Sequence, residues 1–152
     1  MKRLTILVGL AASGKSTVAS KMEQKGAIIV SSDAIRKELF GDESVQSNPT
    51  KVFQIFNERI INALRRGDEW VVADACNIWC RKRKHLIQQV RAAIPEVRIT
   101  AFIIATRLGQ LYSNDENRAR SVGRDVINRQ LCQFQMPCYW EGFDSIKLYY
   151  SF

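Results

Sequence analysis

Short β-branched apolar runs alternate along this chain with longer stretches of helical period. The runs predict strands, and the stretches between them predict helices whose apolar residues recur three or four positions apart. Strands are expected at 4–8, 27–30, 70–73, 99–105 and 146–150. Helices are expected at 15–25, 34–40, 49–66 and 79–93, with two more within 107–135. This alternation is typical of an α/β fold with a parallel sheet of about five strands and helices on both faces, in which 99–105 is a central strand and 146–150 an edge strand.

The first predicted strand leads directly into a phosphate-binding pattern. The segment Gly9-Leu10-Ala11-Ala12-Ser13-Gly14-Lys15-Ser16 fits G-x-x-x-x-G-K-[ST]. In such a loop the backbone N–H groups surround phosphates, and the following helix presents its positive end to the same charge. Strand, loop and helix fall in the order the pattern requires, which favours this interpretation over a glycine-rich turn without chemistry.

The pattern predicts a three-layer P-loop NTPase sandwich that binds ATP, or another nucleoside triphosphate, together with Mg²⁺. Lys15 is expected at the β- and γ-phosphates, and the Ser16 hydroxyl on the metal. The full set of expected nucleotide contacts is Gly9, Ala12, Ser13, Gly14, Lys15, Ser16 and Thr17.

Polar residues follow the next two strands, at the edge where open parallel sheets bind ligands. Asp33 follows the strand at 27–30 and is a candidate base for an acceptor hydroxyl, although it could instead cap the next helix. Arg36, one turn later, could hold an acceptor phosphate. Asp74 could support Arg36, bind a metal-bound water or cap a turn, and Asn77 could contact either an acceptor phosphate or the loop backbone.

Positive charge is in excess, with 23 Lys and Arg against 15 Asp and Glu, a formal charge of +8 and a pI near 9.6. A run of cations, Arg81-Lys82-Arg83-Lys84, occupies the first turns of a predicted helix, where the helix dipole disfavours positive charge. Contact with a polyanion would offset that cost, and we expect Arg81 and Arg83 to bind a nucleic-acid substrate. Surface solubility is the alternative.

A polar segment at about 113–123 lies between the two helices expected within 107–135 and is predicted to be a lid that closes over the phosphates. Arg118 and Arg120 are both candidates to stabilise the charge that develops on a transferring phosphoryl group. The sequence leaves open which of them contacts ATP.

Length and hydropathy bound the organisation of the chain. Its 152 residues predict one domain over 1–152, and no apolar run approaches the 18 residues needed to cross a bilayer. We therefore expect a cytoplasmic protein without a membrane partner, and no partner protein is evident. The four cysteines are expected to be reduced thiols, with zinc binding as the weaker alternative.

Taken in order, the phosphate loop, Ser31-Ser32-Asp33-x-x-Arg36, Asp74-x-x-Asn77 and the arginine segment resemble P-loop kinases of the polynucleotide 5′-hydroxyl kinase type, including their compact bacterial and phage ATP-binding relatives. The resemblance spans about residues 4–145, including the tail 136–144. It implies phosphorylation of the 5′-hydroxyl of DNA or RNA, with Asp33 as base, Arg36 on the phosphate of the reacting end and Asp74 supporting it. It also implies that Arg118 or Arg120 contacts ATP.

Two features of the lid depart from that family. Gly123 follows Val122 where proline is common, and the segment 111–117 is acidic and polar rather than basic. Three other functions remain open at this point: a kinase of a small sugar, nucleoside or antibiotic, a toxin-like kinase of a nucleotide sugar, and a nucleotide-binding regulatory module with weak ATPase activity.

Overall fold

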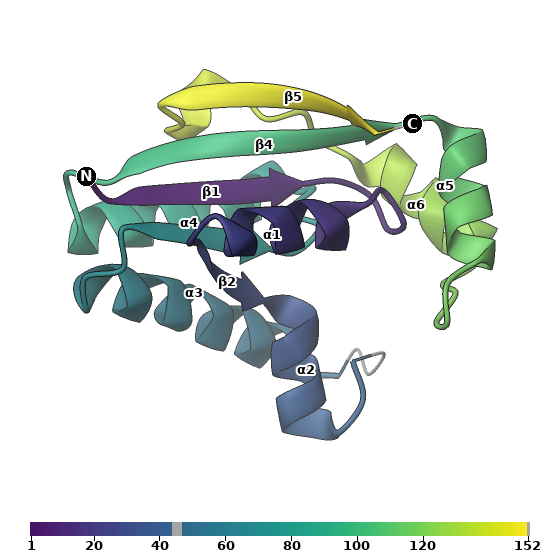
Figure 1. Ribbon diagram of the computed structural model, residues 1–152, viewed down its shortest axis with the longest axis horizontal. Helices are drawn as coiled ribbons and strands as arrows, with labels where there is room; N and C mark the ends of the chain where they lie inside the picture. The colour runs from purple at the N-terminus through teal and green to yellow at the C-terminus, as the bar shows by residue number, and fades with distance from the viewer. Residues whose placement is uncertain (44–46, 152) are drawn as a thin grey trace.

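A five-stranded parallel sheet forms the centre of the molecule (Figure 1). The computed structural model describes residues 1–43 and 47–151. The strand order is β2-β3-β1-β4-β5, and every neighbouring pair is parallel. The strands are β1 (Arg3–Val8), β2 (Ile28–Ser31), β3 (Trp70–Asp74), β4 (Arg98–Thr106) and β5 (Ser145–Ser151). The five-stranded α/β prediction is confirmed.

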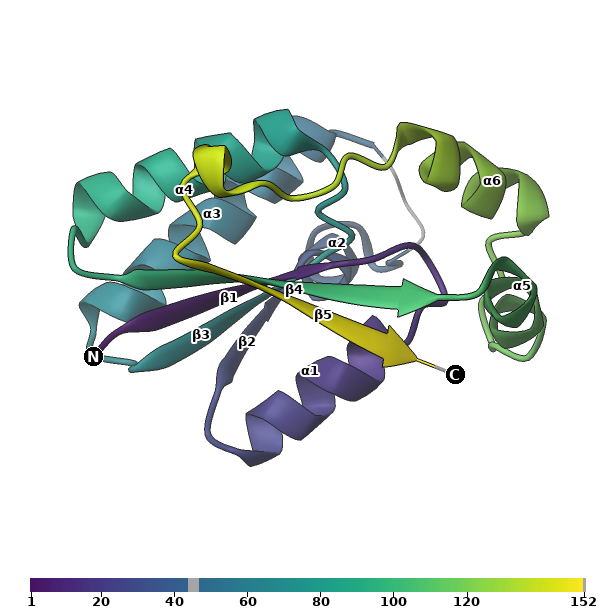
Figure 2. The ribbon, with the colours of Figure 1, turned by 90° about the horizontal axis from the view of Figure 1, so that it is seen from above.

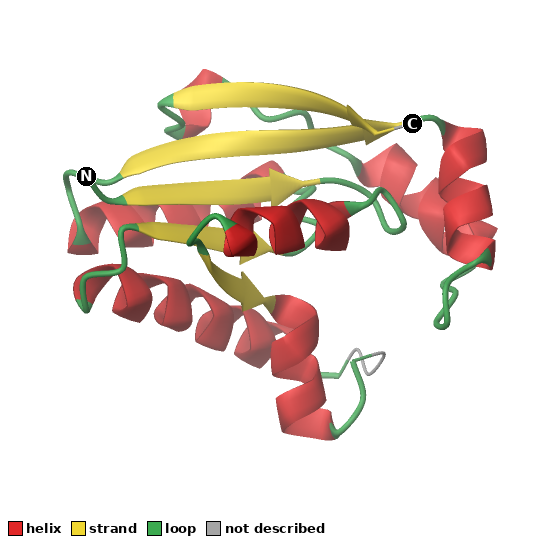
Figure 3. Ribbon diagram, viewed as in Figure 1, coloured by secondary structure: helices red, strands yellow, loops and turns green. Residues whose placement is uncertain are grey.

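Helices cover both faces of this sheet, which gives the three expected layers (Figures 2 and 3). Figure 2 shows α3 and α4 on one face and α1 on the other, and Figure 3 shows the same layers by element type. The helices are α1 (Lys15–Gln24), α2 (Ser32–Phe40), α3 (Pro49–Arg65), α4 (Cys80–Ala93), α5 (Leu108–Glu116) and α6 (Arg124–Gln133), with a 3₁₀ turn η1 (Tyr139–Glu141). The pair α5 and α6 stands at the carboxyl end of the sheet (Figure 1).

The middle strand is β1, not the run 99–105 that the sequence analysis took as central. Leu4, Ile6, Leu7 and Val8 of β1 are completely buried. The strand β4, second from the edge, buries Ile99 and Ala101 but leaves Phe102 half-buried. An apolar run shows that a strand is interior, but not how far from the edge it lies.

Two helices begin where a side chain caps them. The Ser31 hydroxyl accepts a hydrogen bond from the Ala34 amide at 3.2 Å, so α2 begins at Ser32, two residues before the predicted start. The Asn48 side chain accepts from the Lys51 amide at 3.3 Å, with a proline in the first turn of α3, as expected. In the described ranges no helix is both long enough and apolar enough to cross a bilayer.

Parallel pairing brings the strand ends that carry chemistry to one edge of the sheet. Ser31 at the end of β2 pairs with Asp74 at the end of β3, and β3 in turn pairs with β1, which leads into the phosphate loop. The candidate side chains of three segments that are distant in sequence therefore meet at a single site.

Candidate active site

The phosphate loop between β1 and α1 has backbone geometry that suits an anion. Ala12 and Gly14 have positive φ values of 65° and 95°. A Cβ at Gly9 would lie 2.8 Å from the Ser13 hydroxyl oxygen, so the loop has no room for a side chain there. The Ser13 hydroxyl is buried and has no hydrogen-bond partner among the described residues. Left-handed turns of this kind aim successive N–H groups into one concavity, which fits a phosphate chain.

Lys15 and Ser16 lie at the start of α1, beside this concavity. The Lys15 ammonium donates a hydrogen bond to the Leu10 carbonyl at 2.8 Å, and Ser16 and Thr17 are exposed in the first turn. The N-cap residue, Gly14, provides no side-chain cap, so the first amides of α1 are available to an anion. No cluster of three or more His, Cys, Asp or Glu side chains suited to a metal occurs in the described ranges. The exposed Ser16 hydroxyl at the start of α1 offers an oxygen ligand that would suit a magnesium ion shared with the phosphates of a nucleotide.

The helices of the lid hold the phosphate loop from outside, a feature that the sequence analysis missed. The Ala11 amide donates to the Gln130 side chain at 2.8 Å, and the Asn114 side chain donates to the Ala12 carbonyl at 3.0 Å. These contacts join residues more than 100 positions apart. The loop is thus fixed to both α5 and α6.

Asp33 and Arg36 form the acceptor side of the site. Arg36 is buried, and its guanidinium donates to Asp33 at 3.0 Å and to the Ser32 hydroxyl at 3.4 Å. The Asp33 side chain is about half exposed, at 52%. Because Ser31 caps α2, the capping role considered for Asp33 is already filled. Its carboxylate, although paired with Arg36, is half exposed and therefore accessible to an acceptor.

Two aromatic rings and a further cation extend the acceptor side. The Lys82 ammonium lies 4.2 Å from the centre of the Phe53 ring and 4.9 Å from that of Trp79. The Arg36 guanidinium lies over the same Phe53 ring at 5.7 Å. Partial burial, followed by the charge of Arg36, lowers the pKa of Lys82. The sequence analysis singled out Arg81 and Arg83 in this run, whereas Lys82 is the cation that the fold brings beside Arg36.

Asp74 lies between the phosphate side and the acceptor side. Burial raises the pKa of its carboxyl group, the charge of Lys15 opposes this, and the negative charge of Asp33 adds to the increase. Within the described residues Arg36 takes its partners from Ser32 and Asp33, so the predicted hydrogen bond from Arg36 to Asp74 is not formed. Asp74 instead interacts electrostatically with Lys15, which is expected to bind the phosphates, and with Asp33, which is expected to act on the acceptor.

The structure corrects the roles predicted for Asn77 and Arg83. The Asn77 amide donates to the carbonyls of Leu7, Ala73 and Ala75, so it holds the loop backbone rather than a substrate. Arg83 is buried, with its guanidinium in a two-pronged ion pair with Glu141 and a hydrogen bond to the Asn77 carbonyl. Neither side chain is available to a nucleic acid.

The helical period of α4 could have shown from the sequence that Arg83 is buried and Arg81 is not. Arg83 precedes the apolar residues Leu86, Ile87 and Val90 of α4 by three, four and seven positions and therefore belongs to their buried stripe. Arg81 lies outside the stripe and is exposed.

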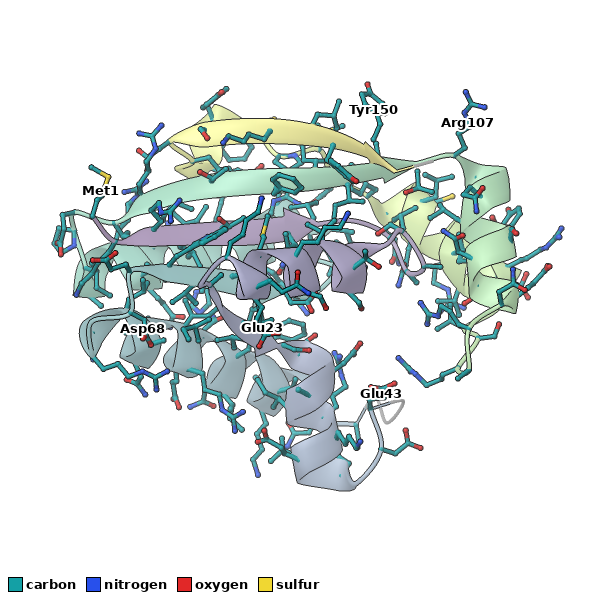
Figure 4. All side chains as sticks on the ribbon, in the orientation of Figure 1. Met1, Glu23, Glu43, Asp68, Arg107 and Tyr150 are labelled. Carbon is teal, nitrogen blue, oxygen red and sulfur yellow. The ribbon has the colours of Figure 1, made fainter. Side chains whose placement is uncertain are left out.

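The two lid arginines have different surroundings. The Arg118 guanidinium donates to the Arg120 carbonyl at 2.9 and 3.2 Å, so it folds the loop itself. Arg120 reaches across to the acceptor side, where Nη2 lies 3.8 Å from Asp33 Oδ2 and Nε lies 3.0 Å from Glu43 Oε1. Figure 4 shows Glu43 beside α2, facing the loop between α5 and α6. Arg120 therefore lies nearer the candidate reaction centre.

Asp115 organises the lid loop and explains why the lid is more acidic than expected. It is buried and accepts hydrogen bonds from the Ser121 hydroxyl and from the amides of Val122 and Gly123. Burial raises the pKa of its carboxyl group, but these hydrogen bonds and the charge of Arg118 outweigh that effect and lower the pKa overall. Gly123 has a φ of 89°, which a proline could not adopt.

Known structures share this fold at low sequence identity. A fungal RNA kinase superposes with a TM-score of 0.67 at 14% identity, over 97% of this chain and 74% of that one. A gluconokinase from Sinorhizobium meliloti 1021 gives 0.64 at 18%, over 96% and 81%. Kti12 of Chaetomium thermophilum, solved in complex with ADP-AlF3, gives 0.76 at 14%, over 97% and 88%.

These neighbours show that the chain shares their fold. No curated protein matches the sequence. A family model does match, over residues 4–137, and by that match the chain belongs to the AAA-domain family.

Proposed function

We propose that this chain is a kinase that transfers the γ-phosphoryl group of ATP to the 5′-hydroxyl end of a polynucleotide. The observation that carries the proposal is the cluster on the acceptor side. There one exposed carboxylate, Asp33, pairs with Arg36. Arg36 and Lys82 both lie over the Phe53 ring, and Lys82 also lies over the Trp79 ring.

The chemistry of this cluster suits the end of a nucleic acid better than a neutral sugar. A polynucleotide end presents a hydroxyl group, a phosphodiester and a base close together. Asp33 offers an acceptor for the hydroxyl proton, Arg36 and Lys82 offer charge to the phosphate, and the exposed ring of Trp79 offers a surface for stacking. A neutral sugar would offer no counter-charge to Lys82, whereas Arg36 already pairs with Asp33.

The transfer assigns a role to each residue. Lys15 and Ser16 would hold the phosphates and Mg²⁺, which supply the phosphoryl group and neutralise its charge. Asp33 accepts the proton of the 5′-hydroxyl group while the oxygen of that hydroxyl group bonds to the γ-phosphorus. The bond from the γ-phosphorus to the bridging oxygen breaks at the same centre, and ADP leaves. Arg120, which extends from the lid toward Asp33, is placed to stabilise the charge on the transferring group.

The decisive experiment follows labelled γ-phosphate from ATP and Mg²⁺ into short 5′-hydroxyl DNA and RNA strands. The same strands carrying a 5′-phosphate are the blocked control, and a mixture of sugars and nucleosides tests small acceptors. We expect label on the 5′-hydroxyl strands only and no transfer by the near-isosteric variant Asp33→Asn. Label confined to a small acceptor would make the protein a metabolite kinase. ATP hydrolysis without transfer to any acceptor would favour the regulatory module.

A matched pair of variants on α4 tests the acceptor side. Lys82→Gln should raise the KM for the oligonucleotide about three- to tenfold, because a partly desolvated charge near the phosphate is lost, while the KM for ATP stays unchanged. Both side chains are exposed, but Lys82 lies over the Phe53 and Trp79 rings. Arg81→Gln removes the same charge one residue away and should have less effect. Equal effects of the two variants would contradict a specific role for Lys82.

A further inference from the structure

We propose that a second surface of this protein, the sheet face beside α1, binds single-stranded nucleic acid. This open sheet face is formed by Thr100 and Phe102 of β4 and by Ser145, Lys147 and Tyr149 of β5. It forms one side of a cavity of about 510 Å³, which α1 bounds on the other side. None of these five residues belongs to the active site.

The face is open because, within residues 1–43 and 47–151, α1 is the only helix over this side of the sheet (Figure 2). The alternate residues of the same strand show the contrast. Ala101 and Ile103 of β4, which point to the side of α3 and α4, are buried in the main core. Phe102, which points to the side of α1, is only half-buried, and Tyr149 beside it is 39% exposed.

The charge of the cavity selects an anion. Among the described residues that line it there is no Asp or Glu, and five are cations: Arg3, Lys21, Lys25, Arg98 and Lys147. These cations come from two strands at one end of the cavity, from the last turn of α1 and from β5. A second copy of this chain, which would bring five more positive charges to the contact, is therefore disfavoured.

The uncharged side chains of the face favour a nucleic acid over an acidic helix. An amphipathic helix needs a stripe of aliphatic partners, but the aliphatic lining consists of Val18 and Met22 of α1 alone. The strands offer hydroxyl groups and rings instead. The Thr100 and Ser145 hydroxyls lie 3.2 Å apart, and the Phe102 and Tyr149 rings stack at 5.9 Å with an interplanar angle of 29°.

A sheet that presents aromatic rings among cations is a platform on which single-stranded bases stack while the phosphates meet the rim. The Tyr149 ring, 39% exposed, stacks against Phe102, and its exposed part offers a surface to a base. The surface runs from Arg3 and Arg98, at the amino ends of β1 and β4, to Tyr149, which pairs with Ile104 near the carboxyl end of β4. Asp33, Arg36 and Lys82 are not among the described residues that line it, so one strand of nucleic acid could contact this face without occupying the acceptor side.

The test measures binding of a fluorescent 12-nucleotide strand of dT or rA that carries a 5′-phosphate and so cannot accept a phosphoryl group. Anisotropy is recorded over a range of salt concentrations for the full chain. The double variant Lys21→Gln/Lys147→Gln should reduce the slope of log K against log salt by about 1.4, at about 0.7 for each lost contact to a single strand. Tyr149→Leu should weaken binding about tenfold by removing a stacking surface.

The control variant Lys51→Gln/Arg65→Gln removes two exposed cations from α3, on the opposite face of the sheet. Equal losses in the control and in Lys21→Gln/Lys147→Gln would overturn the proposal, because binding would then follow net charge alone. Displacement by an acidic peptide with no effect of Tyr149→Leu would overturn it in favour of an acidic protein partner.

This inference goes beyond the proposed function and does not depend on it. The variant Asp33→Asn should lose transfer while keeping the binding of the 5′-phosphorylated strand. Lys21→Gln/Lys147→Gln should keep transfer to a 5′-hydroxyl dinucleotide, because neither lysine is among the residues assigned to the transfer. A failure of either proposal is thus visible in an assay that leaves the other unaffected.

Discussion

The phosphate side and the acceptor side of the site are built in different ways. The phosphate loop is a backbone structure, with its carbonyl and amide groups held by Thr106, Asn114 and Gln130 from three other elements. The acceptor side is made of side chains, and its principal carboxylate, Asp33, is about half exposed. A site of this design fixes the donor rigidly and leaves the choice of acceptor to a few side chains.

The sharpest way to separate the two sides is to remove one charge from each. Lys15→Ala should abolish transfer and weaken ATP binding, because Lys15 is expected to hold the phosphates. Asp33→Ala should lower the transfer rate about 10²- to 10⁴-fold and leave the Kd for ATP within about twofold, because the base contacts the acceptor alone. Label transfer and a fluorescent ATP analogue provide the two measurements. Weak ATP binding in Asp33→Ala would contradict the separation.

The acceptor side also has a buried support that can be removed. Arg83→Met should lower the free energy of unfolding by about 3–5 kcal/mol, because Glu141 would remain buried without its partner. Urea unfolding measures the loss. The exposed neighbour gives the control, since Arg81→Met should change the free energy by less than about 0.5 kcal/mol. Similar values for the two variants would show that the ion pair adds nothing to stability.

The lid arginines provide a smaller contrast between chemistry and folding. Arg120→Gln should lower kcat about 100-fold, as expected for the loss of a charge at the transferring group. Arg118→Gln should mainly reduce the order of the loop, because its hydrogen bond to the Arg120 carbonyl is lost. It should lower kcat by less than about tenfold and make tryptic cleavage of the loop faster. A larger fall in kcat for Arg118→Gln than for Arg120→Gln would show that Arg118, and not Arg120, acts on the transferring group.

The last contrast depends on pH. Because the folded pKa of Asp115 is lowered, its ionised form stabilises the lid loop at pH values above the unfolded pKa of about 3.9. That contribution is lost as the pH falls through the folded pKa. The amide signals of Val122 and Gly123 should therefore titrate together with a midpoint below about 3.9 in an NMR experiment. The same signals should show no such step in Asp115→Asn, and a midpoint above 3.9 would contradict the assignment.

Features with a local cause were predictable from the sequence. Five strands, the start of α3 at its Asn-Pro cap and the phosphate loop follow from periodicity and from a pattern of neighbouring residues. Asp33 was singled out because the carboxyl ends of parallel strands carry ligand sites, and its role as the base stays a prediction.

Features that depend on tertiary packing were not predictable in the same way. The pair Arg83–Glu141 joins residues 58 positions apart, and Lys82 gains its place only when α3 brings Phe53 beside α4. The neighbouring cations Lys82 and Arg83 thus have different surroundings, and this difference cannot be read from the charge of the run alone. The buried stripe of α4 would have assigned Arg83 correctly, since its period extends back to that residue.

The contact between Ala11 and Gln130 also bears on the order in which parts of the site form during synthesis of the protein. The phosphate loop is made before α6, yet a side chain that holds its backbone lies 119 residues later. A nascent chain therefore carries the loop without this contact while those residues are added, and α6 must emerge before the loop reaches its final arrangement.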